Sequence, residues 1–535
     1  MKTLKIFLLF GALFFTLQGA KAQPQEVEPN MFKFGRLLRL IDTQYADTVN
    51  IFSLTEKAIV GMLREMDPHS VYITKDEVAE MNEPLEGGFY GIGISFNIYN
   101  DTLLVLTTIP GGPSEKVGLR PSDRIISVDG NLIAGKGITN KDVFKYLKGP
   151  KGTIVKLQIK RKGVADLLDF TIVRDKIPIN SLDASYMLNN QTGYIKLNRF
   201  SATTTEEFLE AVKGLKTNSG FQNVVLDLRG NGGGYLNAAY ELADHFLDGR
   251  KLIVYTEGLK SLRKDYESSL KGELESGKVV VLIDEGSASA SEILSGAIQD
   301  WDRGLVIGRR SYGKGLVQQQ YYLTDGSMVR LTTAHYYTPS GRCIQRPYED
   351  GVDEYRKDRI RRFENGELFI EDSIHVDEGQ AYKTRMNART VYGGGGIMPD
   401  IFVPMDTSKH YQYYNELLRK NIIYDKVLSI MDKSRDKFKK KYPTFEKYNA
   451  EFEVDDQVID EIVAKGETEG IEKNDESLAF IRPQLKQQMK ALFARDLFTV
   501  SHYYQIVNSD DKTLLKALEV IQNSGIYNKL LAENK

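Results

Sequence analysis

The chain has 535 residues, which is enough for several domains. Its 71 basic and 73 acidic residues leave a formal net charge of −2, so the charge balance does not favour nucleic acid as a partner. The six histidines show no metal-binding spacing, and the single cysteine, Cys343, excludes an intramolecular disulfide. We therefore predict no metal site.

The first 22 residues have the pattern of a cleavable secretory signal. Two lysines precede an apolar run at residues 6–17, and Ala20-Lys21-Ala22 fits a small-x-small cleavage motif. The apolar run is too short to span a bilayer comfortably. We expect an exported protein whose mature chain begins near Gln23 and which resides in the periplasm or at the cell envelope.

Residues 23–86 and 87–175 differ in their periodicity. The first region has apolar residues at helical spacing, with a new helix start at Thr74. His69 lies in a turn between its helices, and we interpret it as structural. The second region alternates in the manner of short strands, with one helix at residues 140–147. The strands are predicted at residues 92–98, 103–109, 124–128, 154–160 and 168–173.

Residues 176–406 alternate between strands and helices, which is typical of an α/β core. A strand at residues 224–228 leads into the glycine-rich run Arg229-Gly230-Asn231-Gly232-Gly233-Gly234 and then a helix. The run lacks the lysine of a phosphate-binding loop. The charge-dense residues 349–378 are predicted to be a surface excursion, and residues 407–535 show helical periodicity.

Residues 279–318 combine a buried strand, a serine-rich turn, a helix, a second strand and a lysine between two glycines. A serine at a helix N-terminus lies where backbone N–H groups can receive a developing oxyanion. A buried lysine nearby can lose its proton and act as a base. Three serines compete for this role, however, and Ser289-x-x-Glu292 is also a capping box. The pattern around Lys314 is also typical of a lysine in a solvated loop.

The same segment resembles the Ser–Lys site of the carboxyl-terminal processing peptidases, also called tail-specific proteases. In that family the nucleophile is the middle serine of a GSASASE stretch, and the lysine follows it by 25 residues in a GKG turn, as Lys314 follows Ser289 here. A glutamine four residues later orients the lysine, and Gln318 stands there. The glycine-rich run resembles the family's second signature. The resemblance implies an oxyanion hole formed by backbone N–H groups of Ala290 and of either Gly232 or Gly233.

Residues 118–130 closely resemble part of a PDZ domain, a fold that adds a peptide as an extra strand and captures its terminal carboxylate with backbone N–H groups. The resemblance assigns this carboxylate loop to Gly91, Ile92, Gly93 and Ile94. A PDZ fold that only braces the protease is the alternative. In several family members an arginine stands at the position of Lys148 and helps to couple the PDZ domain to the active site, so the lysine leaves this coupling open.

The resemblance implies an α/β, crotonase-like (ClpP/crotonase-type) protease core with an inserted PDZ domain, an N-terminal helical segment and a C-terminal helical extension. The corresponding boundaries are a signal peptide at 1–22, the helical region at 23–86, the PDZ domain at 87–175, the core at 176–406 and the extension at 407–535. The implied function is a serine endopeptidase that cleaves exported proteins through an acyl-enzyme, without a metal or organic cofactor. Its implied partners are proteins or peptides with free C-termini, and a second copy or an adaptor bound through the extension.

Two other functions compete with this one. A histidine-dependent serine protease with PDZ domains requires a serine in a Gly-x-Ser-Gly-Gly run, and residues 230–234 offer a glycine instead. A peptide-binding scaffold, meaning an inactive relative, is disfavoured because Ser289, Lys314 and Gln318 are all present. A serine-reactive probe whose labelling is lost in Ser289→Ala distinguishes enzyme from scaffold.

Overall fold

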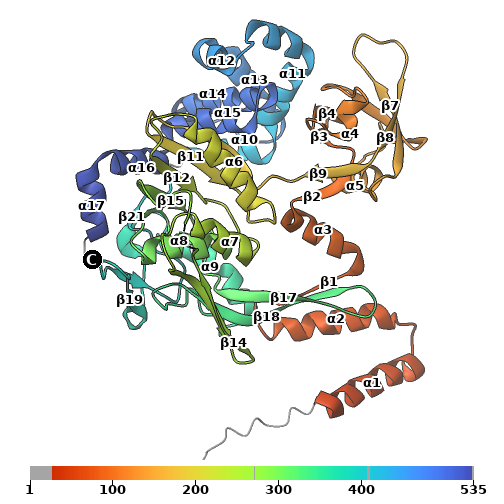
Figure 1. The fold of residues 1–535 in the computed structure, drawn as a ribbon. Helices are drawn as coiled ribbons and strands as arrows, with labels where there is room; N and C mark the ends of the chain where they lie inside the picture. Colours follow the sequence, from red (N-terminus) through yellow and green to blue (C-terminus); the bar gives the residue numbers. More distant parts are fainter. Residues whose placement is uncertain (1–26, 270, 407–409, 533–535) are drawn as a thin grey trace, which may run out of the picture. The chain divides into compact units, whose positions relative to one another are not determined.

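The computed structural model describes residues 27–269, 271–406 and 410–532, in two compact units that divide between Leu63 and Arg64 (Figure 1). The predicted signal peptide, residues 1–22, lies outside the described residues. The first unit contains α1 (Val27–Gln44) and α2 (Ile51–Arg64). α1 buries none of its residues, and large apolar side chains such as Phe32 are exposed.

The second unit is organised around a six-stranded sheet. Its order is β10-β11-β12-β15-β16-β21, and β10 is antiparallel to the five parallel strands. Strands covered on both faces read as continuous apolar runs, which is why residues 279–283 were recognisable as a buried strand. The strands are β10 (Leu182–Met187), β11 (Thr192–Leu197), β12 (Asn223–Asp227), β15 (Val279–Ile283), β16 (Leu305–Gly308) and β21 (Ile401–Phe402).

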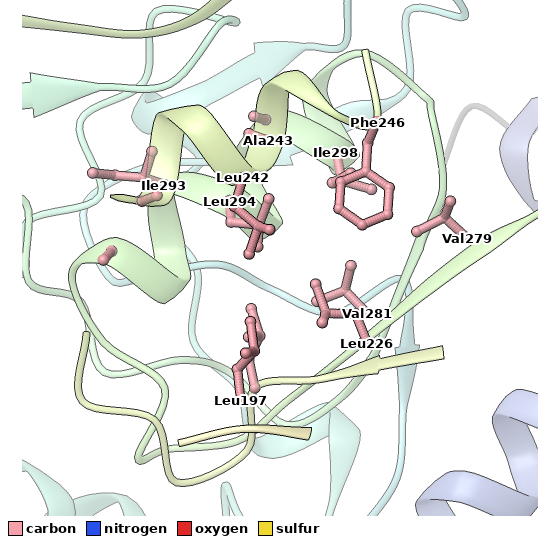
Figure 2. Packing of buried hydrophobic residues seen from close by; sticks show 14 of the residues in the cluster. Leu197, Leu226, Leu242, Ala243, Phe246, Val279, Val281, Ile293, Leu294 and Ile298 are labelled. Atoms are coloured by element: carbon pink, nitrogen blue, oxygen red, sulfur yellow. The ribbon is translucent and has the colours of Figure 1, made fainter. Parts of the chain in front are cut away.

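Successive strand residues face opposite sides of this sheet. Leu226 and Val281 pack with α6 (Thr204–Lys216), α7 (Leu236–Asp244) and α8 (Ala290–Asp300), and Figure 2 shows the convergence of these side chains. Val280 and Leu282 face the other way, toward α16 (Lys512–Gln522) and α17 (Ser524–Ala532). The end of the predicted helical extension therefore packs on the central sheet.

A second sheet carries the segment that follows Lys314. Its longest strand, β18 (Met328–Tyr337), pairs with β17 (Leu316–Tyr322) along most of its length. β1 (Val71–Ile73) pairs with the first part of β18, and β13 (Leu252–Gly258) pairs with its last part and with β14 (Ser261–Glu267). The pairing with β1 brings residues 67–70 beside β18, where the Thr332 N–H donates to the Ser70 hydroxyl oxygen at 3.0 Å.

The strand-rich region is inserted after α3 (Lys75–Glu86). β2 (Gly88–Gly91) enters it and pairs with β9 (Asp175–Pro178), which leaves it. Between them a sheet runs in the order β3-β4-β5-β7-β8, with β6 on β5. Its elements are β3 (Ile94–Ile98), β4 (Leu103–Thr108), α4 (Pro113–Lys116), β5 (Arg124–Val128), β6 (Asn131–Leu132), α5 (Asn140–Leu147), β7 (Ile154–Lys160) and β8 (Leu168–Val173).

A helical region with its own apolar core precedes α16. It contains α10 (Tyr411–Arg419), α11 (Ile422–Lys441), α12 (Phe445–Glu451), α13 (Asp456–Thr468), α14 (Asp475–Leu497) and α15 (Val500–Val507). Among the residues that the structure describes, no helix is both long and apolar enough to cross a membrane.

Residues 349–378 differ from the predicted surface excursion. They contain α9 (Val352–Glu364), which buries Tyr355 and Arg362. The Arg362 guanidinium donates to the carbonyl oxygens of Arg310 at 2.7 Å and Ser311 at 3.0 Å, just before the GKG turn. The high charge of this segment was misleading because several of its charged side chains point inward and are paired. β19 (Ala381–Lys383) and β20 (Thr390–Tyr392) form a small hairpin after it.

Candidate active site

The serine-rich turn joins β15 to α8 and places its three serines differently. Ser287 and Ser291 are fully buried. Their hydroxyls donate to the carbonyl oxygens of Leu228 and Asn231, each at 2.9 Å, and so attach this turn to the glycine-rich run. Ser289 is partly exposed and lines a cleft of about 390 Å³. Only Ser289 of the three is open to a substrate.

Ser289 has an unusual backbone conformation. Its φ of 56° and ψ of −112° lie outside the regions that residues other than glycine usually occupy. Such conformations cost about 1–3 kcal/mol and persist only where the surroundings enforce them. Ser289 and Glu292 also have the capping-box arrangement that the sequence suggested. Capping and exposure to the cleft therefore coexist in one residue.

Glu292 joins the serine turn to the lysine turn. One of its carboxylate oxygens accepts the N–H groups of Ser289 at 2.7 Å and Lys314 at 3.0 Å. The other accepts the Gly313 N–H at 2.7 Å and the Ser311 hydroxyl. Burial raises the pKa of Glu292 to about 7, and the four donors only partly offset that effect. Sequence reasoning identified Glu292 as a helix cap and missed this link.

Lys314 lies just before β17, with Gln318 within that strand. The Lys314 ammonium donates to the Gln318 side-chain oxygen at 2.9 Å, and the Gln318 amide nitrogen donates to the carbonyl oxygen of His69. Burial, and after it the positive charge of Arg330, lowers the pKa of Lys314 from 10.5 to about 8. The alternative of a solvated loop lysine does not fit this environment.

Two further residues complete the surroundings of the lysine. The Tyr336 hydroxyl can donate to the Ser289 carbonyl oxygen, 3.1 Å away, or to the Lys314 carbonyl oxygen. His69 contributes its backbone, and its ring lies 2.9 Å from the Tyr355 hydroxyl oxygen. Burial lowers the pKa of His69 to about 3, so its ring is neutral near pH 7. Tyr336 carried no signal in the sequence beyond its place in a strand.

The glycine-rich run approaches Ser289 closely. A Cβ on Gly233 would lie 2.7 Å from the Ala288 carbonyl oxygen and 2.8 Å from the Ser289 Cβ, so only glycine fits there. The Gly233 N–H donates to the Asn231 side-chain oxygen at 2.9 Å. The N–H groups of Gly232 and Ala290 have no acceptor among the described residues. Of the predicted oxyanion donors, these two remain available.

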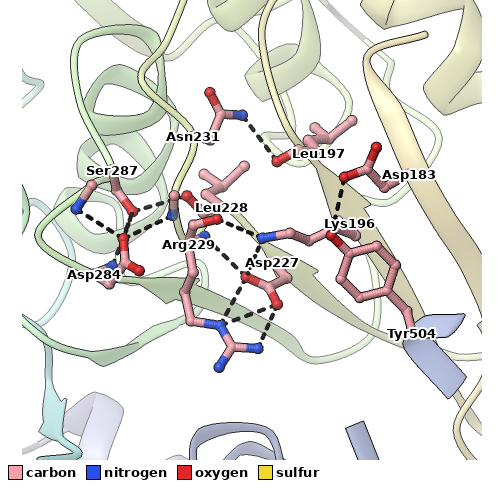
Figure 3. Close-up of polar contacts among 12 residues, drawn as sticks. Asp183, Lys196, Leu197, Asp227, Leu228, Arg229, Asn231, Asp284, Ser287 and Tyr504 are labelled. Carbon is pink, nitrogen blue, oxygen red and sulfur yellow. Dashed lines mark hydrogen bonds and ion pairs between the residues drawn. The ribbon is translucent and has the colours of Figure 1, made fainter. Parts of the chain in front are cut away.

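A buried ionic cluster fixes the start of this run (Figure 3). Asp227 accepts from Arg229 at 2.6 Å, from Lys196 at 3.2 Å and from the Tyr194 hydroxyl at 2.8 Å. Burial alone would raise the pKa of Asp227, but Arg229 and Lys196 hold it below its ordinary value. Arg229 also pairs with Asp511, the N-cap of α16, at 2.8 Å.

The predicted carboxylate loop connects β2 to β3. Gly93 has a φ of 75°, which glycine adopts readily. The N–H groups of Ile92 and Gly93 have no acceptor within the described chain. β3 pairs only with β4 among the described strands, so its other edge is open. Lys148, at the end of α5, pairs with Glu83 of α3 at 2.5 Å.

The described residues contain no group of three or more histidine, cysteine, aspartate or glutamate side chains arranged to hold a metal ion. Ser289, Lys314, Gln318, Gly232 and Gly233 all line the same cleft. The arrangement offers an accessible hydroxyl, a lysine of lowered pKa and free N–H groups, which are the components of acyl transfer.

Comparison with known proteins identifies the family. The family model of peptidase family S41 matches residues 191–354. The carboxy-terminal-processing protease of Bartonella bacilliformis is 37% identical over 325 residues, which is 60% of this chain and 74% of that protein. The chain belongs to peptidase family S41. It is a serine protease of the carboxy-terminal processing type, as the resemblance predicted.

Two further proteins are similar to this chain. The carboxy-terminal processing protease CtpB of Bacillus subtilis is 36% identical over 324 residues, or 60% of this chain and 67% of that protein. A solved structure of a photosystem II D1 C-terminal processing protease is 30% identical, with a TM-score of 0.34, and the match covers 60% of this chain and 91% of that one.

Other parts of this S41 peptidase match separate family models. A PDZ domain matches residues 104–161, which confirms the predicted PDZ domain. The N-terminal domain of the activating protease CtpB matches residues 15–77. A family of unknown function, DUF8443, matches residues 413–499. The predicted architecture of a mixed α/β core with a PDZ domain and helical regions at both ends is confirmed.

Proposed function

We propose that this S41 peptidase is an endopeptidase that acts through an acyl-enzyme formed on Ser289, with Lys314 as the general base. The observation that carries the proposal is the meeting, in one cleft, of the accessible serine with a buried lysine whose pKa is about 8. Near neutral pH a usable fraction of such a lysine is unprotonated.

The reaction begins when the Ser289 hydroxyl attacks the scissile carbonyl carbon and Lys314 takes its proton. Gln318, itself held by the His69 carbonyl, fixes the position of the lysine amine. The N–H groups of Gly232 and Ala290 then stabilise the tetrahedral oxyanion, and each such donor is worth about 3 kcal/mol. Lys314 returns the proton to the leaving amine, and water hydrolyses the acyl-enzyme.

Glu292 and Tyr336 act as positioning residues for both partners. Each contacts the backbone of Ser289 and the backbone of Lys314, so a shift of one turn is transmitted to the other. This double attachment accounts for the enforced backbone conformation of Ser289. The proposed reaction uses no metal or organic cofactor.

The PDZ domain is assigned the capture of the substrate C-terminus. A peptide adds as a strand to the open edge of β3, and its carboxylate is bound by the loop of Gly91, Ile92, Gly93 and Ile94. The free N–H groups of Ile92 and Gly93 support this assignment. Substrates are then proteins or peptides with accessible C-termini.

Four broader proposals come from the sequence analysis. The segment at residues 1–22 is a signal peptide, and the enzyme works in the periplasm or at the cell envelope. The core has the crotonase-like form of the α/β fold. The domain boundaries are those at 22, 86, 175 and 406, with residues 512–532 packed on the core sheet. A second copy or an adaptor binds through residues 407–535.

Digestion of an unfolded model protein tests the chemistry. Mature wild type is expected to cleave it, Ser289→Ala to be inactive, and Ser291→Ala to retain part of the activity, because the buried Ser291 hydroxyl helps to hold the turn but does not line the cleft. A serine-reactive probe should label wild type and Ser291→Ala but not Ser289→Ala. Cleavage by Ser289→Ala, or labelling of it, would overturn the nucleophile assignment.

The same assay tests the PDZ assignment. A substrate with an amidated C-terminus is expected to be cleaved more slowly than its free-acid form. An insertion that disrupts the loop at residues 91–94 should remove this difference. Equal cleavage rates for both substrates in the wild type would favour the alternative, in which the PDZ domain only supports the protease core.

A further inference from the structure

Arg330 is a cation in the active-site cleft without an anionic partner. It lies on β18, opposite Gln320 of β17 and Val71 of β1, and it lines the same cleft as Ser289 and Lys314. Tyr336, six residues later on the same strand, also lines the cleft, although the register with β17 shifts between these two residues. Arg330 therefore shares one cleft with Ser289 and Lys314.

The Arg330 guanidinium makes no hydrogen bond or ion pair with any described residue, and its Nη2 atom is buried. Other buried arginines of the core are paired. Arg342 pairs with Asp300, and Arg389 with Asp302, each at 2.7 Å. Arg303 donates instead to several backbone carbonyls. Arg330 is partly exposed, and it differs from these arginines because its guanidinium, including the buried Nη2, has no partner among the described residues.

Partial burial of an unpaired charge costs free energy, and a ligand that supplies the opposite charge removes this cost. Burial lowers the pKa of Arg330, and only the Tyr235 side chain acts in the opposite direction. The remaining neighbours along the cleft include the apolar Leu85, Leu236 and Ile293. None of the residues that line the cleft is acidic.

We propose that Arg330 is a specificity-determining residue that binds a carboxylate of the substrate beside the scissile bond. The planar guanidinium matches a carboxylate with two parallel hydrogen bonds. The carboxylate comes from an aspartate or glutamate side chain or from the C-terminus of the substrate. The proposal rests on the proposed function, because it assumes that the peptide bond is cut at Ser289.

A second effect of Arg330 must be separated from this one. Its charge also helps to lower the pKa of Lys314. Loss of that effect would change the cleavage of all peptides by the same factor, whereas loss of carboxylate binding would slow acidic peptides selectively. The ratio of two substrates therefore isolates the binding role.

The test uses a peptide that the full-length mature enzyme cleaves, with glutamine or glutamate at each of the three positions on either side of the cut. Each peptide is prepared with a free and with an amidated C-terminus. The quantity compared is kcat/KM for wild type, Arg330→Gln, Arg330→Lys and Arg356→Gln. Arg356 is exposed on α9, so its replacement removes the same charge away from the cleft.

In the wild type, a carboxylate at one of these positions is expected to raise kcat/KM by roughly tenfold, the value of one charged hydrogen-bonded pair. Arg330→Gln should reduce this ratio to about one while still cleaving the neutral peptides. Arg330→Lys should keep part of the preference, and Arg356→Gln all of it. A preference for glutamate over glutamine that is lost in Arg330→Gln identifies a side chain as the source, and a preference for the free over the amidated C-terminus that is lost in Arg330→Gln identifies the C-terminus.

An unchanged ratio in Arg330→Gln overturns the inference and leaves the proposed function intact. Circular dichroism shows whether Arg330→Gln folds. If it does not, Arg330→Lys provides the test, because a lysine that preserves the full preference contradicts a contact made through two parallel hydrogen bonds. If Ser289→Ala still cleaves the peptides, the proposed function fails and the inference fails with it.

Discussion

Asp227 and Glu292 are two fully buried carboxylates of the protease core whose surroundings differ in kind. Asp227 is held by the cations Arg229 and Lys196, and its pKa lies below the ordinary value. Glu292 is held by three N–H groups and a hydroxyl, and burial raises its pKa to about 7. Full charges therefore overcome the cost of burial, and dipoles reduce it only in part.

This difference in pKa corresponds to the part of the site that each carboxylate holds in place. Asp227 fixes the start of the glycine-rich run, which must stay in place at every pH at which the enzyme works. Glu292 fixes the backbones of Ser289 and Lys314, and its own charge changes near neutrality. The carboxylate beside the glycine-rich run thus stays charged, whereas the one between the serine and lysine turns changes its charge near neutral pH.

The largest expected effect comes from Asp227→Asn, which leaves Arg229 and Lys196 buried without their shared anion. We expect the free energy of unfolding to fall by about 3–5 kcal/mol. Denaturant titration measures this loss. Asp265→Asn removes an exposed partner of Arg263 and should cost far less, because solvent screens an exposed pair. Equal losses of unfolding free energy in the two variants would show that burial does not make the Asp227 pairs more important for stability than the exposed Asp265 pair.

A second prediction concerns stability as a function of pH. Because the pKa of Glu292 is raised in the folded state, from 4.5 to about 7, its contribution is fully present below pH 4.5 and is lost as pH rises through 7. The expected loss is roughly 3 kcal/mol across that window. Asp227, with its lowered pKa, contributes the opposite slope under more acidic conditions.

Unfolding of wild type and Glu292→Gln, measured at half-unit steps from pH 4 to 8, checks this slope. The difference between their unfolding free energies should shrink as pH rises. A difference that does not vary with pH would mean that Glu292 does not titrate in this window.

Glu292→Gln should also slow catalysis. The amide retains one oxygen acceptor, so its nitrogen faces two of the four donors and the serine and lysine turns separate. A displacement of about 1 Å at the reacting atoms costs roughly 10²-fold in rate. The expected outcome is a loss of that size in kcat with a smaller change in KM. A variant with unchanged kcat would remove Glu292 from the positioning residues.

The smallest effect is expected for the charge of Arg330 acting on Lys314. Burial is the larger cause of the lowered pKa of the lysine, and Arg330 is second. Arg330→Gln should therefore raise the pKa of Lys314 and move the midpoint of the rising limb of kcat/KM for a neutral peptide to higher pH, by less than about 1 unit. A shift to lower pH would contradict this electrostatic effect.

Much of this arrangement could be predicted from local sequence. The apolar runs at residues 224–228 and 279–283 marked the buried strands. The 25-residue spacing of Ser289 and Lys314 identified two residues that the structure brings into one cleft. Their catalytic roles remain predictions, as do those of Gln318 and the oxyanion N–H groups.

The features that were missed depend on contacts between distant segments. Tyr336 and Arg330 look like ordinary members of an alternating strand, and only the pairing of β17 with β18 brings them to Lys314. Arg362 was read as surface charge because its partners, the carbonyls of Arg310 and Ser311, lie some 50 residues earlier in the chain. Periodicity carries no information about such partners.

The packing of α16 and α17 bears on when this enzyme can first become active during its biosynthesis. These helices cover the second face of the central sheet, and Asp511 anchors Arg229 beside the glycine-rich run. A nascent chain that lacks residues 511–532 would contain Ser289 and Lys314, but one face of its central sheet would be uncovered and Arg229 would lack its partner Asp511. We expect such a shortened chain to cleave an unfolded model protein more slowly than the full chain does.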